Sequence, residues 1–368
     1  MAFFRDSRRR IGRQILAGCR RLKDLFVGKP ALPGIDAFPR KILIIRPYFL
    51  GDILLCLPIV QAIRQQRKDA HITWLLRKEW QSLLQDHAPV DEVIPFSQQR
   101  MHSPAAIGEF LRVARELRKR SFELVLNLSW DRSSVLWSWI SGAPVRVGIE
   151  EYGRPRLLSL LHTVTVQAPE RSQDDRHMAD FYYDPLRLLG FEPRSGQPHV
   201  APTAPELDFV DTRLKANFGK MPSFLLVHPG GRLAYKRWPV ERFAGLLDRL
   251  EQQTAHVIIV ACGPGEEPWA SALVAKRDSG RFLFWPSPSL GELMALARGA
   301  TLFIGNDSGP MHLAAACGCR VVAIVGADSP RWLPLGEGHL VVRDPQGLEK
   351  VSVSQVVEMV NQEPMLHL

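Results

Sequence analysis

The sequence predicts an α/β fold with two domains, each built on a parallel β-sheet covered by helices. Short apolar runs of strand length alternate with segments of helical periodicity from residue 39 onward. A chain of 368 residues with 46% hydrophobic content can bury two cores of ordinary size. A Pro-rich segment at 197–205 interrupts the alternation. We therefore expect one domain over residues 39–205 and a second over 206–345.

The first domain is expected to begin with a short apolar strand, Lys41 to Ile45, and a helix from about Asp52 to Arg67. Further strands are expected at 71–75, 92–94, 124–128 and 145–148, with a strongly periodic helix at 105–120 between two of them. Helices that separate successive strands favour a parallel sheet.

The second domain repeats this alternation. Strands are expected at 224–228, 256–261, 282–285, 301–304 and 320–325. Neither half carries the glycine pattern of a dinucleotide-binding fold or of a P-loop, which counts against a dehydrogenase and a P-loop kinase.

Positive charge is concentrated at the N-terminus. Residues 1–40 contain ten Lys or Arg and three Asp, a net charge of +7, so the other 328 residues carry only +2 of the total of +9. A body this close to neutral does not indicate a nucleic-acid binder. Apolar residues recur at helical spacing among the arginines of residues 5–29. Residues 1–38 are therefore expected to form a basic amphipathic helix for an anionic membrane surface, with a solvated leader as the alternative.

Other targeting and metal signals are weak. No apolar core long enough for a secretory signal follows the arginines, and no apolar run of 18 residues is present. Five unclustered cysteines indicate reduced thiols, and Cys317-Gly-Cys319 lacks the spacing of a metal site. We expect no metal and no cofactor.

Open parallel sheets bind ligands at the carboxyl ends of their strands, so the loops after the strands are the candidate sites. The loop after the first strand contains Arg46, Gly51 and Asp52. The Asp52 carboxylate is a candidate general base for a sugar hydroxyl. The alternative is a helix cap, because an aspartate at a helix start is stabilised by the dipole.

In the second domain, the loop after residue 228 contains Gly230, Gly231 and Lys236. The glycines allow the backbone to approach a ligand, and a lysine ammonium suits a leaving phosphate. A surface loop with solvated cations is the alternative. Glu266 and Glu267 follow the next strand, where they could hold ribose hydroxyls or simply occupy a first helical turn.

The stretch 301–318 is expected to form a strand, a tight polar turn and a helix. Gly309 permits an unusual backbone, and the helix N-terminus can hold a phosphate. Asp307, Ser308 and His312 can add side-chain hydrogen bonds to such an anion. A capped turn with no ligand is the alternative.

Three motifs in order make a distinctive combination: Ile-Leu-Ile-Ile-Arg with Leu-Gly-Asp at 42–52, His-Pro-Gly-Gly with Lys-Arg-Trp-Pro at 228–239, and Gly-Asn-Asp-Ser-Gly-Pro-Met-His at 305–312. Between about Lys41 and Gly336 the chain resembles the ADP-heptose:lipopolysaccharide heptosyltransferases, glycosyltransferase family 9. This resemblance implies the GT-B fold, in which two Rossmann-like domains face a cleft. It also implies that a C-terminal helix within 346–368 returns to the first domain.

The resemblance also assigns roles to the candidate residues. Asp52 becomes the inverting base, with Lys236 neutralising the leaving diphosphate. Donor contacts fall on Gly230, Gly231, Asp307, Ser308, Gly309 and His312, with Glu266 or Glu267 on the ribose. Acceptor contacts are expected from Arg46, Gly51 and Trp130.

The resemblance implies transfer of a heptose from ADP-heptose to a lipopolysaccharide core or related glycolipid, without a metal, at the cytoplasmic face of the inner membrane. The loop from Gly230 to Tyr235 departs from the Thr-rich and acidic loop of well-known members. The alternatives are therefore a relative that uses another nucleotide sugar, or a nucleotide-sugar epimerase or binder on the same architecture.

Overall fold

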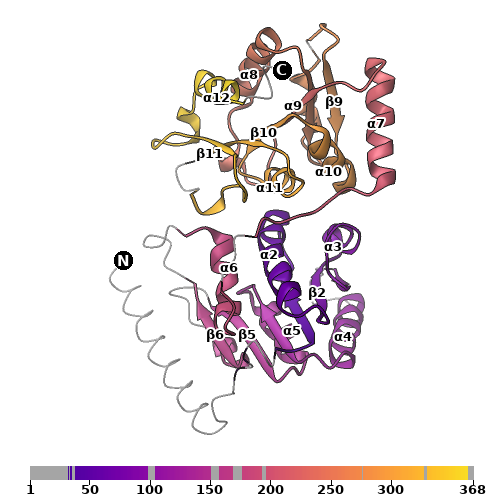
Figure 1. Ribbon diagram of the computed structural model, residues 1–368, viewed down its shortest axis with the longest axis vertical. Coiled ribbons are helices and arrows are strands. Elements are labelled where there is room, and N and C mark those ends of the chain that lie inside the picture. The colour runs from indigo at the N-terminus through magenta and orange to yellow at the C-terminus, as the bar shows by residue number, and fades with distance from the viewer. Residues whose placement is uncertain are drawn as a thin grey trace. The chain divides into compact units, whose positions relative to one another are not determined.

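The computed structural model describes residues 32, 34, 38–97, 104–150, 157–168, 176–192, 196–275, 277–326 and 330–363. The chain divides into two compact units, with the change between Gly196 and Gln197 apart from two short segments, Phe49–Leu57 and Asp86–Ala88. Each unit contains a six-stranded parallel sheet with helices, as predicted (Figure 1). The predicted basic helix at residues 5–29 lies outside the described residues.

The first sheet has the strand order β3-β2-β1-β4-β5-β6. Its strands are β1 (Lys41–Ile45), β2 (His71–Arg77), β3 (Glu92–Phe96), β4 (Leu124–Asn127), β5 (Val145–Glu150) and β6 (Val164–Gln167). The central strands β1 and β4 are mostly apolar, because both faces of a parallel sheet are covered. The edge strand β6 was not predicted.

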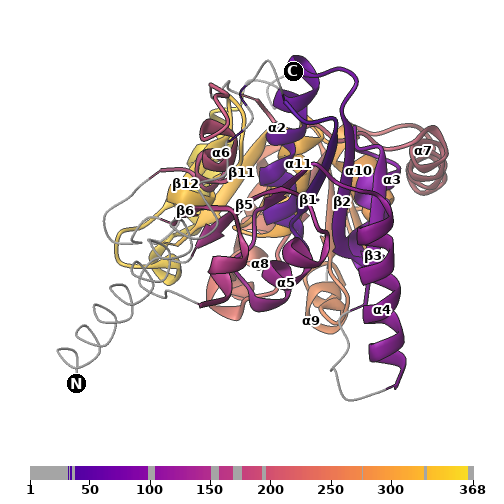
Figure 2. The ribbon, with the colours of Figure 1, turned by 90° about the horizontal axis from the view of Figure 1, so that it is seen from below.

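Helices cover this sheet and connect its strands. They are α2 (Leu50–Gln66), α3 (Gln81–Gln85), α4 (Pro104–Lys119), α5 (Arg132–Ile140) and α6 (Met178–Arg187), with short 3-10 turns η2 (Lys78–Trp80) and η3 (Leu157–Leu161). Val113 and Leu117 of α4 and Trp137 of α5 pack with Leu43 and Ile45 of β1 in one core. Figure 2 shows β1, β2 and β3 in sequence across the sheet, with α4 beside β3.

The second sheet has the order β12-β11-β10-β7-β8-β9. Its strands are β7 (Phe224–His228), β8 (Val257–Cys262), β9 (Phe282–Pro286), β10 (Leu302–Asn306), β11 (Val321–Val325) and β12 (Leu340–Arg343). Its helices are α7 (Ala204–Phe218), α8 (Val240–Gln253), α9 (Glu267–Ala272), α10 (Leu290–Gly299), α11 (Gly309–Ala316) and α12 (Val353–Asn361), with η4 (Ala234–Lys236), η5 (Pro330–Trp332) and η6 (Leu348–Lys350). The edge strand β12 was also not predicted.

The last helix belongs to the core of the second unit. Val356, Val357 and Val360 of α12 are buried with Leu246 and Leu250 of α8 on one face of the second sheet. The return of the segment 346–368 to the first domain stays a prediction.

The two sheets have the same topology. Counted within each unit, both follow the doubly wound order 3-2-1-4-5-6. The strands are first added toward one edge of the sheet and then toward the other, and this switch lies between β1 and β4 in the first sheet and between β7 and β10 in the second. Loops at such a point leave to opposite sides and open a space for ligands. None of the described helices is long and apolar enough to cross a membrane.

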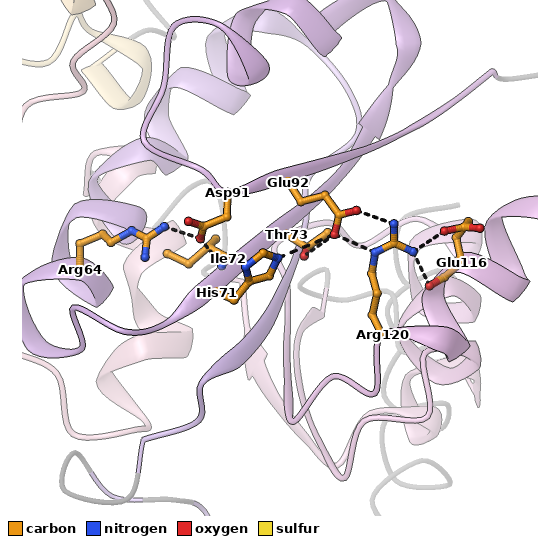
Figure 3. Close-up of polar contacts among 8 residues, drawn as sticks. All are labelled: Arg64, His71, Ile72, Thr73, Asp91, Glu92, Glu116 and Arg120. Atoms are coloured by element: carbon orange, nitrogen blue, oxygen red, sulfur yellow. Dashed lines mark hydrogen bonds and ion pairs between the residues drawn. The ribbon is translucent and has the colours of Figure 1, made fainter.

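A cluster of ion pairs lies at the amino end of the first sheet, where β2 and β3 begin (Figure 3). The guanidinium of Arg120, just beyond α4, donates to Glu92 at the start of β3 with an Nε–Oε2 distance of 2.7 Å, and it also binds Glu116. Beside it, Asp91 accepts the N–H of Ile72 at 2.7 Å. The hydrogen bond from Arg120 lowers the pKa of Glu92 from its ordinary value of 4.5. This cluster connects the start of β3 to the end of α4. It lies at the amino ends of the strands, whereas the candidate loops follow their carboxyl ends.

We predict that Arg120→Ala lowers the free energy of unfolding by roughly 1 kcal/mol at pH 7, because the partly buried pair is lost. The folded-state pKa of Glu92 is depressed, so the pair stabilises above pH 4.5 and its contribution disappears as the pH falls through the folded-state pKa. Urea denaturation at several pH values measures this difference. Arg115→Ala, on the exposed side of α4, is the control. An equal loss in both variants, independent of pH, would contradict the assignment.

Candidate active site

In both sheets the residues singled out from the sequence lie at the topological switch point. Strands β7 and β10 are hydrogen-bonded neighbours in the second sheet. The loop 229–239 follows β7, and residues 307–309 follow β10 and lead into α11. The structure therefore brings together two of the predicted donor loops, which are about 70 residues apart in the sequence.

The side chain of Asn306 holds the loop after β7 in place. Asn306 is fully buried at the end of β10. Its Nδ2 donates to the carbonyl oxygens of Pro229 at 2.7 Å and Gly230 at 3.1 Å, and its Oδ1 accepts the N–H of Trp238 at 3.0 Å. One amide thus ties both ends of the loop to β10. The sequence motifs assigned no role to Asn306, although an amide at a strand end can both donate and accept hydrogen bonds and so was an available signal.

Lys236 lies within this loop, in the turn η4, and its ammonium contacts Asp307. The Nζ–Oδ2 distance is 2.7 Å, and the side chains are 27% and 6% exposed respectively. The ammonium also lies 5.8 Å from the centroid of a Trp332 ring. A positive charge is therefore held at the end of β10 with part of its surface open to solvent.

Glu266 joins the loop after β8 to the loop after β7. Its carboxylate accepts the backbone N–H of Gly231 at 2.8 Å and of Gly263 at 2.9 Å, and Arg237 lies 3.4 Å from it. A Cβ atom at position 230 would stand 1.8 Å from Glu266 Oε2, so Gly230 is required for this close approach. Both oxygens of the buried carboxylate are thus occupied by the protein itself.

Glu267 has a different environment. It begins α9 and accepts a hydrogen bond from the hydroxyl of Ser287, which follows β9 and lowers the pKa of Glu267. Ser287 has a φ of 42°, a left-handed conformation, and its N–H donates to the carbonyl of Cys262 at 3.1 Å. Of the two predicted ribose ligands, Glu267 is the one with a partly exposed side chain.

The N-terminus of α11 has the features of an anion site. Ser308 occupies the N-cap position, but its Oγ makes no hydrogen bond to the helix and has no partner among the described residues. Gly309 and Pro310 form the first turn, and His312 is buried in the next. Free N–H groups and the helix dipole favour a negative charge at this position, as the sequence predicted.

A neutral histidine lies beneath these loops. Burial lowers the pKa of His228, at the end of β7, against the opposing charge of Glu266. Its ring stacks on Phe303 with centroids 6.5 Å apart. His228 therefore packs against β10 at the start of the loop that carries the glycines.

We searched the described residues for a cluster of metal-ligating side chains. No group of three or more His, Cys, Asp or Glu side chains there could hold a metal ion. Cys317 and Cys319 are both buried, and burial raises the pKa of Cys319 to about 12.

In the first unit, Arg46 joins the ends of β1 and β4. Its guanidinium donates to the carbonyl of Leu128 at 3.0 Å, to Ser129 Oγ at 3.2 Å and to the hydroxyl of Tyr182 at 2.6 Å. It also lies 5.4 Å from the centroid of a Trp130 ring. The predicted acceptor residues Arg46 and Trp130 are thus neighbours, and Arg46 orders the loop that carries Trp130.

Asp52 and Gly51 lie in the first turn of α2, directly after the loop that leaves β1. The helix begins at Leu50, two residues earlier than expected, and Phe49 precedes it with a φ of 63°. The carboxylate of Asp52 is therefore at the carboxyl end of β1, at the switch point of the first sheet.

We predict that Asn306→Leu lowers the free energy of unfolding by about 3 kcal/mol, because two carbonyls and one N–H lose a buried partner. Chemical denaturation followed by circular dichroism measures the loss. Asn217→Leu is the matched control, since Asn217 is exposed on α7 and makes one hydrogen bond, to the carbonyl of Arg213. A loss for Asn306→Leu no larger than for Asn217→Leu would contradict the bracing role.

Comparison with known proteins places this site in context. A family model described as glycosyltransferase family 9 (heptosyltransferase) matches residues 110–357. Over 300 residues the chain is 25% identical to lipopolysaccharide heptosyltransferase 3 of Escherichia coli (strain K12), covering 78% of this chain and 83% of that protein. A family 9 glycosyltransferase structure from Veillonella parvula DSM 2008 matches with a TM-score of 0.78 at 22% identity, covering 89% of this chain and 98% of that one. The structure of E. coli ADP-heptose lipopolysaccharide heptosyltransferase II matches with a TM-score of 0.73 at 21% identity, covering the same shares. These structures share the fold, which is the predicted GT-B fold.

Proposed function

The chain belongs to glycosyltransferase family 9, and we propose that it transfers a heptose from ADP-heptose to the core of a lipopolysaccharide or to a related glycolipid. The observation that carries this proposal is the charged site at the second switch point. There, the Lys236 ammonium and the N-terminus of α11 lie at the ends of neighbouring strands. A nucleoside diphosphate presents the negative charge that such a site stabilises.

In the proposed reaction, the Asp52 carboxylate removes the proton of an acceptor hydroxyl as its oxygen attacks the anomeric carbon. The bond from that carbon to the diphosphate breaks, and ADP leaves with the electron pair, which inverts the anomeric configuration. An aspartate in the first turn of a helix is a weak base, but the hydroxyl becomes more acidic as its bond to carbon forms. Lys236, Ser308 and the helix N-terminus then stabilise the departing charge, so the proposal requires no metal.

The geometry distinguishes the two candidate ribose ligands. Both oxygens of Glu266 accept backbone N–H groups, so its proposed role is to shape the donor loop. Glu267 keeps a partly exposed carboxylate beside Ser287, and we assign the ribose contact to it. Gly230 and Gly231 would let the backbone approach the diphosphate, with Asp307, Gly309 and His312 completing the donor site.

The acceptor is proposed to bind near Gly51, in the first turn of α2, and near Trp130, in the loop that Arg46 orders. A lipopolysaccharide acceptor would place the enzyme at the cytoplasmic face of the inner membrane. Ten Lys or Arg against three Asp in residues 1–40 support contact of residues 5–29 with anionic lipid.

We predict that Asp52→Asn lowers kcat by about a thousandfold, because the acceptor hydroxyl loses its base. The dissociation constant for ADP should change less than about threefold, since the proposed base acts on the acceptor hydroxyl, which ADP does not contain. Steady-state transfer assays and calorimetric titration with ADP measure the two effects. Asp69→Asn, at an exposed carboxylate, is the control. Retention of more than a tenth of the activity would exclude Asp52 as the base.

Lys236→Met is predicted to weaken ADP binding and to lower kcat/KM by roughly a hundredfold, because the ammonium neutralises the diphosphate. Lys236→Arg should recover only part of the loss, since its planar group does not reproduce a point charge beside Asp307. Lys215→Met on α7 is the matched control, at a largely exposed lysine. An unchanged ADP affinity in Lys236→Met would remove this residue from the donor site.

A further inference from the structure

Helix α4 carries apolar side chains on its exposed side as well as on the side that packs against the core. Val113 and Leu117 face the core of the first unit, with Phe110 beside them. Ile107 and Leu111 are nevertheless 50% and 53% exposed. They are four residues apart and therefore occupy one face of the helix. Neither side chain belongs to the hydrophobic core of the first unit.

The charges of α4 are unequally neutralised. Glu109 pairs with Arg112 at 3.0 Å, and Glu116 pairs with Arg120. Both acidic side chains of the helix are thus occupied by neighbouring arginines. No described acidic residue forms an ion pair with the remaining arginines of α4.

Those remaining arginines lie on the same face as the exposed aliphatic residues. Arg115 and Arg118 follow Leu111 by four and seven residues, and both are exposed. Arg118 reaches the end of α5, since its Nη1 lies 2.6 Å from where a Cβ at Gly142 would stand. Ile107, Leu111, Arg115 and Arg118 together are called the α4 face.

We propose that the α4 face is a second membrane contact, which binds an anionic phospholipid surface independently of residues 5–29. Aliphatic side chains next to arginines that pair with no described acidic residue suit the interface between lipid headgroups and acyl chains. A second copy of the chain is a poorer occupant, because a two-fold contact would gather the arginines of two identical faces with no described acidic residue between them. An acidic protein partner would use the arginines, but it leaves the aliphatic pair unexplained.

The two contacts complement each other. A single weak membrane anchor gives reversible binding, whereas two anchors on one chain act through effective concentration. The α4 face also lies on the unit proposed to bind the acceptor. The inference concerns binding to lipid and does not depend on the transfer reaction.

The test is sedimentation of the full chain with vesicles of phosphatidylcholine alone and with about one quarter phosphatidylglycerol. To reduce the contribution of the N-terminal segment, all proteins carry Arg8→Gln, Arg9→Gln and Arg10→Gln. One variant adds Ile107→Ser and Leu111→Ser, and a second adds Arg115→Glu and Arg118→Glu. The matched control adds Phe209→Ser and Met221→Ser, at two exposed apolar positions of the second unit that are 53% and 39% exposed.

We expect each α4 variant to bind the anionic vesicles at least about tenfold more weakly than the parent, and the control to bind as the parent does. Transfer to a soluble acceptor should be unchanged in all of them, which separates this inference from the proposed function. The inference is overturned if the parent does not bind anionic vesicles, or if both α4 variants bind as the parent does. Equal losses in the control and the α4 variants would also overturn it. Retained binding to vesicles with loss of binding to an acidic protein would assign the face to a protein partner instead.

Discussion

The side-chain amide of Asn306 is the constraint on which the geometry of the second switch point depends. The loop 229–239 forms no strand pairing, so the polar groups at its ends need partners from elsewhere. Asn306 supplies three hydrogen bonds from a fully buried position, and the turn between them carries Lys236 to Asp307. These bonds join groups of the protein itself, so the position of the ammonium does not depend on contacts from a diphosphate. Such preorganisation is the main way a protein strengthens an electrostatic site.

Other buried polar side chains also hold loops in place. The residues that position the loops are therefore different from those available to contact a ligand. Glu266 connects two loops of the second unit, and Arg46 connects two strand ends of the first. Each is buried, and each makes several hydrogen bonds to backbone or neighbouring side chains. The groups with remaining capacity are different ones, such as the Ser308 hydroxyl and the Glu267 carboxylate. A ligand can therefore bind without disturbing the frame that orients the site.

The sequence predicted the central strands because their apolar runs are continuous, and it predicted the site loops because ligands bind at strand ends. It missed the edge strands β6 and β12, which are only four residues long and mostly half-buried. It could not separate Glu266 from Glu267, since adjacent carboxylates look alike until the burial of each is known. Arg46 was interpreted as an acceptor ligand, but its partners lie 82 to 136 residues away, beyond the reach of a local pattern. Motif spacing thus selected the candidate loops, and long-range contacts decided which of their side chains hold the loops in place.

The most direct test of the account is a crystal structure of the protein with ADP bound. The account predicts that the β-phosphate lies within hydrogen-bonding distance of Lys236 Nζ and Ser308 Oγ at the N-terminus of α11. The Asn306 and Glu266 hydrogen bonds should be unchanged. A diphosphate bound elsewhere, or a loop 229–239 that rearranges and releases Asn306, would contradict the claim that this switch point is a preformed donor site.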